Sequence, residues 1–481
     1  MVAGGLFVIL ATANGAGYRY GASDQAFYIP VVARALDPAL FPRDGALIDA
    51  EGRLMVIDEI LSALVRTSGL SLEALFFAGY LLSMALLWIG AVLVGSRVYR
   101  NVWVVAALGA ALTFRHRIPR TSANSFEPYF HPRVLAFALG TLAVAALLRR
   151  HPRIAIALVA LCALVHITTG LWFAILIGVA LVVLDPRWRA PMAVGVVAAA
   201  VLLAGAVAAG PLRGGLVPMD EVWLQAVASK DSLFATDWPF WAWAANFGLL
   251  TVLWWAHRVR VRRGSATPED GALVWGASAL VALFLATLPA VAAGVSLAVQ
   301  FQISRVFWLV DFLALVFLLA VFVETRSPRT AATLAALLLV LSAARGAYIM
   351  LAERPERRLF ELGLPASPWQ DALRWVASRP RDVHLLADPG HAWKYGTSAR
   401  VAAARDVLVE EVKDSALAIY SRDTAVRFVD RMVAIGDFPS LTADRARDLS
   451  RRFDLDYLVT EADLPLPTVY RNEQFRIYAL K

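Results

Sequence analysis

The chain has 481 residues, of which 59% are hydrophobic and 17% charged, and its formal net charge at pH 7 is +8. Soluble globular domains carry about 45–50% apolar and about 25% charged residues, so this composition excludes a single soluble domain. The positive charge lies between apolar runs, where it indicates membrane topology rather than nucleic-acid binding. The single cysteine, Cys162, lies inside an apolar run, which excludes an intrachain disulfide and a cysteine metal cluster.

Eleven apolar runs predict membrane-spanning helices along most of the chain. They cover residues 4–16, 74–95, 102–114, 134–148, 154–165, 171–184, 191–209, 241–255, 273–299, 307–323 and 331–352. Several are shorter than the about 20 residues that a span needs, so these helices are expected to extend into their loops. The runs at 154–165 and 171–184 are alternatively one long helix, broken between His166 and Gly170.

The placement of arginines predicts the orientation of the chain. Alternate short loops carry arginines, and because basic loops stay in the cytoplasm, these loops define the cytoplasmic side. The N-terminus is then expected inside and the C-terminal segment outside, in a multi-pass protein of the bacterial cytoplasmic (inner) membrane. The arginines are Arg97, Arg100, Arg149, Arg150, Arg153, Arg187, Arg189, Arg258, Arg260, Arg262, Arg263, Arg326 and Arg329.

Four segments are expected on the outer side: a long first loop at 17–72, loops at 115–133 and 210–240, and the C-terminal segment. Helical periodicity at 24–36 and 54–65 of the first loop predicts amphipathic helices on the membrane surface. The C-terminal segment shows helix patterns at 368–378, 422–435 and 442–453, strand patterns at 383–388 and 456–461, and a hairpin at 468–480. The predicted fold class is a polytopic α-helical membrane protein of about eleven transmembrane helices, residues 1–352, with a small C-terminal α/β extracytoplasmic domain, residues 362–481.

The loop at 115–133 carries four arginines on the expected outer side, against the positive-inside rule; they are Arg115, Arg117, Arg120 and Arg133. Guanidinium groups bind phosphate through paired hydrogen bonds, so an anionic ligand at the level of the lipid headgroups would compensate their charge. A patch that binds ordinary anionic lipids explains the same arginines. Arg305, at the outer end of another run, either completes the phosphate site or extends to the membrane interface.

The same loop holds three further candidates, Glu127, His116 and His131. They are expected either to add acid–base function or to pair with the arginines. Within the apolar runs, His166 and Asp311 are functional candidates, because polar residues at membrane depth are rare. An interhelical hydrogen bond explains His166 nearly as well, and a structural pair with Arg345 would explain Asp311.

A carboxylate, that of Asp24, follows soon after the first apolar run. Just outside the bilayer it could deprotonate an acceptor hydroxyl or coordinate a metal. Ser23 and Asp24 also precede an apolar-periodic stretch, as N-cap residues do, and position alone favours the cap. Asp44 and Asp49 are weaker candidates, because neighbouring Pro and Gly residues indicate turns.

This layout resembles the GT-C superfamily of membrane glycosyltransferases, which take sugars from polyprenyl-phosphate carriers. The resemblance rests on the acid in Gly21-Ala-Ser-Asp-Gln-Ala-Phe-Tyr28 of a long first loop, the number of spans, the outer basic residues and the soluble C-terminal domain. The stretch from Phe453 to Tyr478 is also similar to the end of such proteins. In that superfamily the first-loop carboxylate acts as base or metal ligand, which raises the expectation for Asp24 above that of a cap. Many members have two acids where this chain has Asp24-Gln25, so a metal-dependent mechanism loses support, although a divalent metal is left open.

This resemblance implies a GT-C-type glycosyltransferase. It would move a sugar from a polyprenyl-phosphate carrier to a glycan, lipid or protein acceptor at the outer face. Asp24 is the expected base and His131 or His166 its helper, while the substrate and its phosphate are held by Arg115, Arg117, Arg120, Arg133, Arg305, Gln25 and Glu127. Membrane lipid is an expected partner and nucleic acid is not. The alternatives are a transporter or flippase of an anionic lipid-linked substrate, against which the apolar inner halves of the runs count, and a non-catalytic scaffold.

Overall fold

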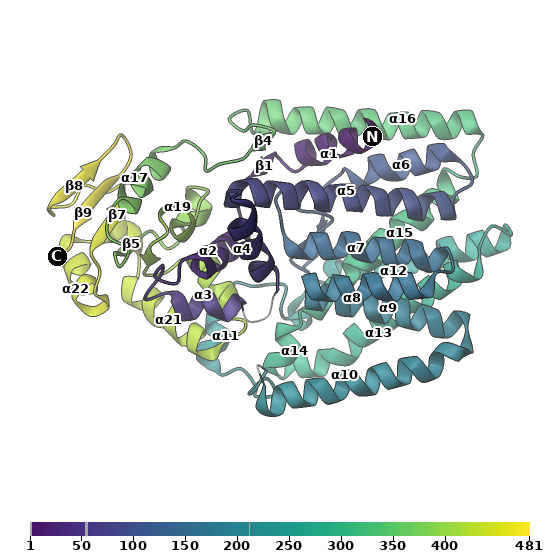
Figure 1. Ribbon diagram of the computed structural model, residues 1–481, viewed down its shortest axis with the longest axis horizontal. Coiled ribbons are helices and arrows are strands. Elements are labelled where there is room, and N and C mark those ends of the chain that lie inside the picture. Colours follow the sequence, from purple (N-terminus) through teal and green to yellow (C-terminus); the bar gives the residue numbers. More distant parts are fainter. Residues whose placement is uncertain (1, 53–55, 211) are drawn as a thin grey trace. The chain divides into compact units, whose positions relative to one another are not determined.

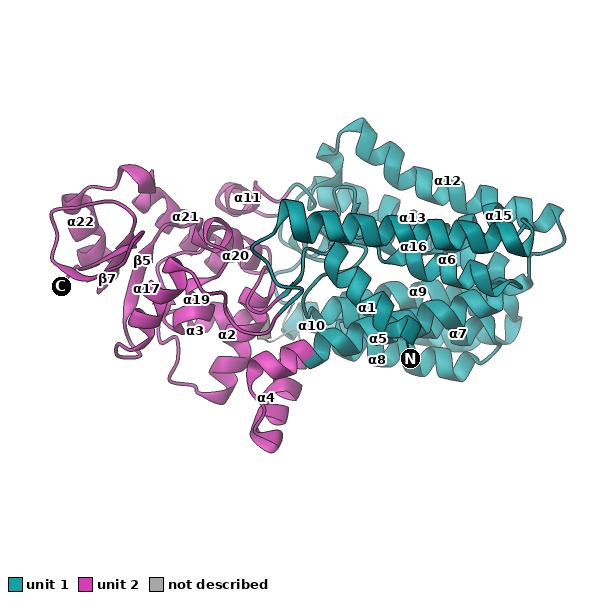
Figure 2. Cartoon of the chain, turned by 90° about the horizontal axis from the view of Figure 1, so that it is seen from above, with its two compact units in different colours: residues 1–18, 78–218, 231–360 teal, residues 19–77, 219–230, 361–481 magenta. Residues whose placement is uncertain are grey.

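The computed structural model (Figure 1) describes residues 2–52, 56–210 and 212–481. The chain divides into two compact units (Figure 2). Unit 1 comprises Met1–Tyr18, Ala78–Pro218 and Asp231–Phe360, and unit 2 comprises Arg19–Phe77, Met219–Lys230 and Glu361–Lys481. Most of the first loop, expected as part of the membrane domain, is therefore grouped with the C-terminal segment.

Long apolar helices that pack side by side build unit 1 (Figure 1). Among the described residues, six stretches are long and apolar enough to cross a membrane: Leu72–Val98, Ile167–Leu184, Pro186–Ala209, Pro268–Ala292, Ser296–Phe322 and Pro328–Glu353. Four shorter apolar helices and α12, of 23 residues, account for the other predicted runs. The chain is therefore an integral membrane protein, and the predicted polytopic α-helical fold is confirmed.

Each of the eleven predicted apolar runs coincides with a helix. These helices are α1 (Val2–Asn14), α5 (Leu72–Val98), α6 (Val102–Leu112), α7 (Pro132–Leu148), α8 (Pro152–Val165), α9 (Ile167–Leu184), α10 (Arg189–Ala209), α12 (Phe240–Arg262), α13 (Pro268–Ala292), α15 (Val306–Phe322) and α16 (Pro328–Tyr348). Short elements between them are β2 (Arg117–Ile118), β3 (Ala123–Asn124), η1 (Pro186–Trp188), η2 (Ala235–Asp237), α14 (Ser296–Gln300), η3 (Ile303–Arg305) and the π-turn η4 (Ile349–Glu353).

The runs at 154–165 and 171–184 form two helices and not one, because α8 and α9 pack against each other. Their close approach depends on Gly170, where an added Cβ would lie 2.3 Å from the Cα of Ala163. His166 is the one residue between the two helices and adopts an extended backbone conformation (φ −156°, ψ 103°). The turn therefore presents this histidine at the start of α9.

Two predicted ends of spans differ from the structure. The helix predicted at 273–299 ends as α13 at Ala292, because Gly294 takes a φ of +67° and Leu297 then donates its N–H to the Gly215 carbonyl at 2.7 Å. In contrast, α12 continues past residue 255 into the arginines predicted as a loop. Arg260 lies buried within it and pairs with the buried Asp270 at 3.0 Å.

Unit 2 contains a five-stranded mixed sheet with the strand order β6-β5-β7-β9-β8. The strands are β5 (His384–Ala387), β6 (Asp406–Val407), β7 (Tyr457–Thr460), β8 (Thr468–Arg471) and β9 (Arg476–Ala479). β5 runs parallel to β6 and β7, whereas β9 is antiparallel to β7 and β8. Its helices are α11 (Glu221–Val227), α17 (Pro368–Ala377), α18 (His391–Lys394), α19 (Ala399–Ala403), α20 (Glu411–Leu417), α21 (Arg422–Ile435), η5 (Phe438–Ser440) and α22 (Ala443–Phe453).

The first loop contributes α2 (Gln25–Leu36), α3 (Gly45–Gly52) and α4 (Ile57–Ser68) to unit 2. α2 has no exposed residue and packs on α3, α4 and α19, so the prediction of a membrane-surface helix is wrong for α2. α4 keeps exposed apolar side chains, Ile60 and Leu64 among them. The first two residues of its predicted range, 54 and 55, lie outside the described residues. A further two-stranded sheet pairs β1 (Tyr18–Arg19) with β4 (Phe360–Glu361).

Candidate functional site

The arginine-rich loop at 115–133 is held by a buried carboxylate in unit 1. Glu127 receives hydrogen bonds from Arg115 and Arg133, each at 2.9 Å, and from the Asn124 amide at 2.8 Å. Only 2% of the Glu127 residue surface is exposed. Of the two roles expected for Glu127, the structure therefore shows pairing with the arginines.

The other two arginines of this loop point elsewhere. Arg120 forms an ion pair with Asp231 and lies 5.9 Å from the centre of the Trp241 ring. Arg117 is exposed, and none of the residues that the structure describes forms an ion pair with it. Neither side chain belongs to the arrangement around Glu127.

His131 and His166 each begin a long helix of unit 1. The Nδ1 atom of His131 accepts the N–H of Arg133 at 3.2 Å, which caps α7, where Pro132 takes the first helical position. The Nδ1 atom of His166 accepts the Thr169 N–H at 3.3 Å and lies 2.9 Å from its hydroxyl, which caps α9. Because both Nδ1 atoms act as acceptors, the neutral imidazoles carry their proton on Nε2 and are hydrogen-bond donors there.

The structure brings four predicted site residues together, which we call the His–Arg cluster: His131, His166, Arg133 and Arg305. The two imidazole rings meet edge to face with their centres 6.5 Å apart. His166 also interacts electrostatically with Arg133 and Arg305. The cluster thus combines two guanidinium groups with the N-termini of α7 and α9, whose dipoles are positive at that end. Such a site is suited to an anion.

Asp311 and Arg345, considered above as a pair, have different partners. Asp311 contacts the Nε2 atom of His116 at 3.0 Å, and this hydrogen bond raises the pKa of His116. Arg345 donates instead to the side-chain oxygen of Asn14 at 2.7 Å. The pairing expected between Asp311 and Arg345 is therefore wrong, and His116 serves as a contact between its loop and α15.

Asp24 and Gln25 lie in unit 2, at the beginning of α2. Asp24 occupies the N-cap position, but its side chain makes no capping hydrogen bond, so the cap interpretation is wrong. Its carboxylate lies 3.4 Å from the Nζ atom of Lys413, and 29% of the side chain is exposed. Gln25 is buried and accepts the N–H of Gly21 at 2.8 Å, so it fixes the loop that precedes Asp24.

Asp44 and Asp49, the weaker candidates, have structural partners. Asp44 is fully buried in unit 2 and accepts hydrogen bonds from Arg400 at 2.8 Å and from Arg427. These arginines keep the pKa of Asp44 well below its ordinary value, against the effect of burial, which raises it and is the larger single influence. Asp49 pairs with Arg34 at 2.9 Å near the surface. Asp44 is therefore closed to solvent, whereas Asp49 is a surface ion-pair partner whose side chain is 48% exposed.

Sequence reasoning missed the lysines beside Asp24. Lys413 comes from α20 and Lys230 from the short segment after α11, far from Asp24 along the chain. The available signal was their rarity, since lysine accounts for four of the 46 basic residues. No group of three His, Cys, Asp or Glu side chains in the described part of the chain is placed to hold a metal ion.

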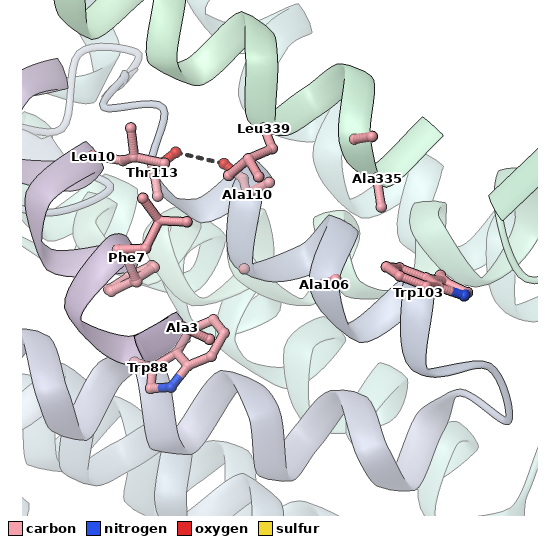
Figure 3. Close-up of a pocket in the computed structure, with 13 residues that line it drawn as sticks. Ala3, Phe7, Leu10, Trp88, Trp103, Ala106, Ala110, Thr113, Ala335 and Leu339 are labelled. Atoms are coloured by element: carbon pink, nitrogen blue, oxygen red, sulfur yellow. Dashed lines mark hydrogen bonds between the residues drawn. The ribbon is translucent and has the colours of Figure 1, made fainter. Parts of the chain in front are cut away.

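An apolar cavity of about 220 Å³ lies among α1, α5, α6 and α16 of unit 1 (Figure 3). Trp88 and Trp103 contribute aromatic walls, and Thr113 lines it with a polar side chain. The Thr113 hydroxyl lies 2.5 Å from that of Ser342, which accepts a hydrogen bond from Asn14 at 3.0 Å. The cavity has the lining of a site for a hydrocarbon chain. Its other lining residues are Ala3, Leu6, Phe7, Leu10, Ala106, Gly109, Ala110, Ala335, Ala336 and Leu339.

The fold and these residues define a polytopic α-helical membrane protein with a basic cluster in its helical unit and an aspartate–lysine cluster in its α/β unit. The chain matches no protein-family model and no curated protein. Among solved structures it is similar to the crystal structure of the Archaeoglobus fulgidus oligosaccharyltransferase tethered with an acceptor peptide, with a TM-score of 0.40 and 14% identity over 95% of this chain and 68% of that chain.

Proposed function

We propose that this chain is a glycosyltransferase that moves a sugar from a polyprenyl-phosphate carrier to an acceptor at the outer face of the cytoplasmic membrane. The observation that carries the proposal is the His–Arg cluster of unit 1, where Arg133 and Arg305 interact with His166 at the N-terminus of α9. A sugar-linked polyprenyl phosphate has one negative charge, and the leaving polyprenyl phosphate has two. Fixed positive groups stabilise the charge that develops during this change.

Asp24 is the proposed base. It would take the proton of the acceptor hydroxyl as that oxygen bonds to the anomeric carbon of the sugar. The bond from this carbon to the phosphate oxygen breaks, and polyprenyl phosphate leaves with the electron pair. What supports this role is that the carboxylate is partly exposed and is not used as a helix cap.

The test uses the full-length protein in lipid nanodiscs with a panel of polyprenyl-phosphate sugars and candidate acceptors. Release of free polyprenyl phosphate, followed by mass spectrometry, is the measure of turnover. We expect D24N to lose turnover at least 100-fold while it still binds polyprenyl phosphate, in line with the typical contribution of a general base. We expect R305Q to weaken binding of polyprenyl phosphate about tenfold, as loss of a charged hydrogen-bond donor does.

The matched control is R213Q, because Arg213 is an exposed arginine of unit 1 outside the cluster. Equal binding by wild type and R305Q would contradict the phosphate site. Binding of the carrier with movement across the bilayer but no release of sugar would identify a flippase instead. Tolerance of both substitutions in a cell that needs the protein would identify a scaffold.

A further inference from the structure

Lysine is rare in this chain, and two of the four lysines lie beside Asp24 in unit 2. The four are Lys230, Lys394, Lys413 and Lys481 among 46 basic residues. Arginine is always charged and grips both oxygens of a carboxylate, whereas lysine is a compact charge that contacts one oxygen and can lose its proton. Lysine at these two positions therefore indicates a role for a compact ammonium group that contacts a single carboxylate oxygen.

Lys413 is fixed in place by its surroundings. Its Nζ atom lies 3.4 Å from Oδ1 of Asp24 and 4.7 Å from the centre of the Phe27 ring, and 9% of its side chain is exposed. The next residue, Asp414, forms two hydrogen bonds with the buried Arg400 at 2.5 and 3.0 Å. The buried ion pairs of unit 2 thereby set the position of α20 and of its lysine.

Lys230 lies against the same part of α20. Its Nζ atom donates to the carbonyl of Val412, the residue before Lys413, at 3.0 Å. Burial, followed by the charge of Lys413, lowers the pKa of Lys230 to about 8, while Asp24 and Glu411 act in the opposite direction. The cluster thus brings the side chains of Lys230 and Lys413 within electrostatic reach of Asp24 and Glu411.

The backbone before Asp24 is also tightly held. Ser23 takes a φ of +50°, which is uncommon for a residue other than glycine. Gly21 has a φ of +75°, and an added Cβ there would lie 2.9 Å from Leu364. Strained backbone that the surroundings fix in this way is typical of functional sites. Asp24 itself has a helical backbone conformation (φ −71°, ψ −9°), and its side chain makes no capping hydrogen bond.

We propose that Lys413 is a positioning residue for Asp24: its ammonium group keeps the carboxylate ionised and near Lys413, without a capping hydrogen bond to α2. This inference rests on the proposed function of Asp24 as a base. A base must be ionised before it accepts a proton, and a nearby ammonium group favours the ionised form. The separation of 3.4 Å exceeds the 2.7–2.9 Å typical of a direct charge-assisted hydrogen bond, so the contact leaves the carboxylate able to accept a proton.

The first test does not depend on transfer activity. A water-soluble carbodiimide applied to the full-length protein in nanodiscs should join Asp24 and Lys413 in an isopeptide bond, detected by peptide mass spectrometry. Carbodiimide reacts with the protonated carboxyl, so the pH dependence of Asp24 modification reports its ionisation. In K413Q we expect the midpoint of this modification to move upward by about one pH unit, as for loss of an opposite charge at this distance.

The control is K394Q, since Lys394 of the same unit pairs with Asp388 and Glu461 and does not touch Asp24. It should leave the midpoint unchanged. The inference is overturned if no cross-link forms in the wild type, or if K413Q folds and shows the wild-type midpoint. The cross-link needs no variant and therefore decides the pairing even if K413Q fails to fold.

The second test measures release of polyprenyl phosphate against pH. We expect K413Q to lower kcat at pH 7 at least tenfold with little change in KM, and to move the acid limb of the profile upward by about one pH unit. K413R should restore the ionisation of Asp24 but only part of kcat, because guanidinium binds both carboxylate oxygens. A shifted midpoint without turnover on any donor would leave the positioning intact and remove the glycosyltransferase proposal. Turnover in K413Q equal to that of the wild type would remove the positioning alone.

Discussion

Asp24 and Asp44 both come from the first loop and lie in unit 2, but their carboxylates have opposite surroundings. Asp44 is fully buried, and Arg400, Arg427 and the Val407 N–H all donate to it. The Asp24 carboxylate lies 3.4 Å from Lys413, and its side chain is 29% exposed. A carboxylate whose acceptor sites are filled by buried donors stabilises a fold, whereas one that is partly open to solvent can exchange a proton with a substrate. The contrast separates an anchor from a candidate base.

The largest expected effect is on folding, in D44N. Removing one partner from a buried ion pair leaves an uncompensated charge and costs about 3–5 kcal/mol, so unit 2 should unfold at a much lower temperature. D24N should change stability by less than about 0.5 kcal/mol, as for a partly exposed pair. Thermal unfolding of the full-length protein, with hydrogen exchange at β6, measures both. A similar loss of stability in D44N and D24N would contradict the contrast between the two carboxylates.

D49N is the matched control for this experiment. Asp49 pairs with Arg34 at 2.9 Å, but 48% of the Asp49 side chain is exposed. Its removal should therefore cost no more than about 0.5 kcal/mol. If D49N destabilised unit 2 as D44N does, the sensitivity would lie in the loop as a whole and not in the buried carboxylate.

The buried charged groups of unit 2 should also make its stability depend on pH in the acid range. The pKa of Glu410 is lowered to about 2 by Arg400 and His391, even though burial, the largest influence, raises it. The unfolded chain binds this proton near the ordinary value of 4.5. The contribution of Glu410 to stability is therefore complete above pH 4.5 and is lost as pH falls toward 2. Burial lowers the pKa of His384 from 6.5 to about 4, so the unfolded state also binds more protons between these values, and stability falls as pH falls through that range.

H384Q tests this dependence. The variant should remove the slope of thermal midpoint against pH between about 6.5 and 4 and keep the slope below 4.5. D24N should keep both slopes, because it leaves Glu410 and His384 in place. Retention of the upper slope in H384Q would show that another group titrates there.

Much of the fold was predictable, because its signals are local in the sequence. Apolar length alone marked every span, and alternation in the C-terminal segment located α17, α21, α22, β5 and β7. The missed elements are short, such as β6 and α19, and they form through contacts with distant segments. The prediction that α2 lies on the membrane surface was wrong for the same reason. Periodicity shows that a helix has an apolar face but does not show which segment covers that face.

The site was predictable only in its residue types. Charge placement singled out His131, His166, Arg133 and Arg305, which the structure places together. No sequence pattern could show that Glu127 compensates two arginines or that Lys413 reaches Asp24, because those partners are set by tertiary packing. Whether the His–Arg cluster and Asp24 serve one reaction stays a prediction.

E127Q in unit 1 tests a buried carboxylate that pairs with arginines, as Asp44 does, but lies beside a proposed binding site, as Asp24 does. The variant keeps the shape of the side chain but removes the charge that compensates Arg115 and Arg133, each bonded at 2.9 Å. We expect a loss of about 1–2 kcal/mol in stability together with about threefold tighter binding of polyprenyl phosphate, because the local positive charge rises. Weaker binding would show instead that Glu127 positions Arg133 for the ligand.

The finest distinction is expected at His166. The side chain caps α9 through Nδ1, so its proposed role in phosphate binding must be separated from its role as a cap. Asparagine is a good N-cap and alanine is not, so H166N should hold stability within about 0.5 kcal/mol, whereas H166A should lose about 1 kcal/mol. Both variants lack the imidazole and should lose affinity for polyprenyl phosphate equally. If H166N binds the carrier like the wild type, His166 acts only as a helix cap. Its role is then structural, like that of Asp44.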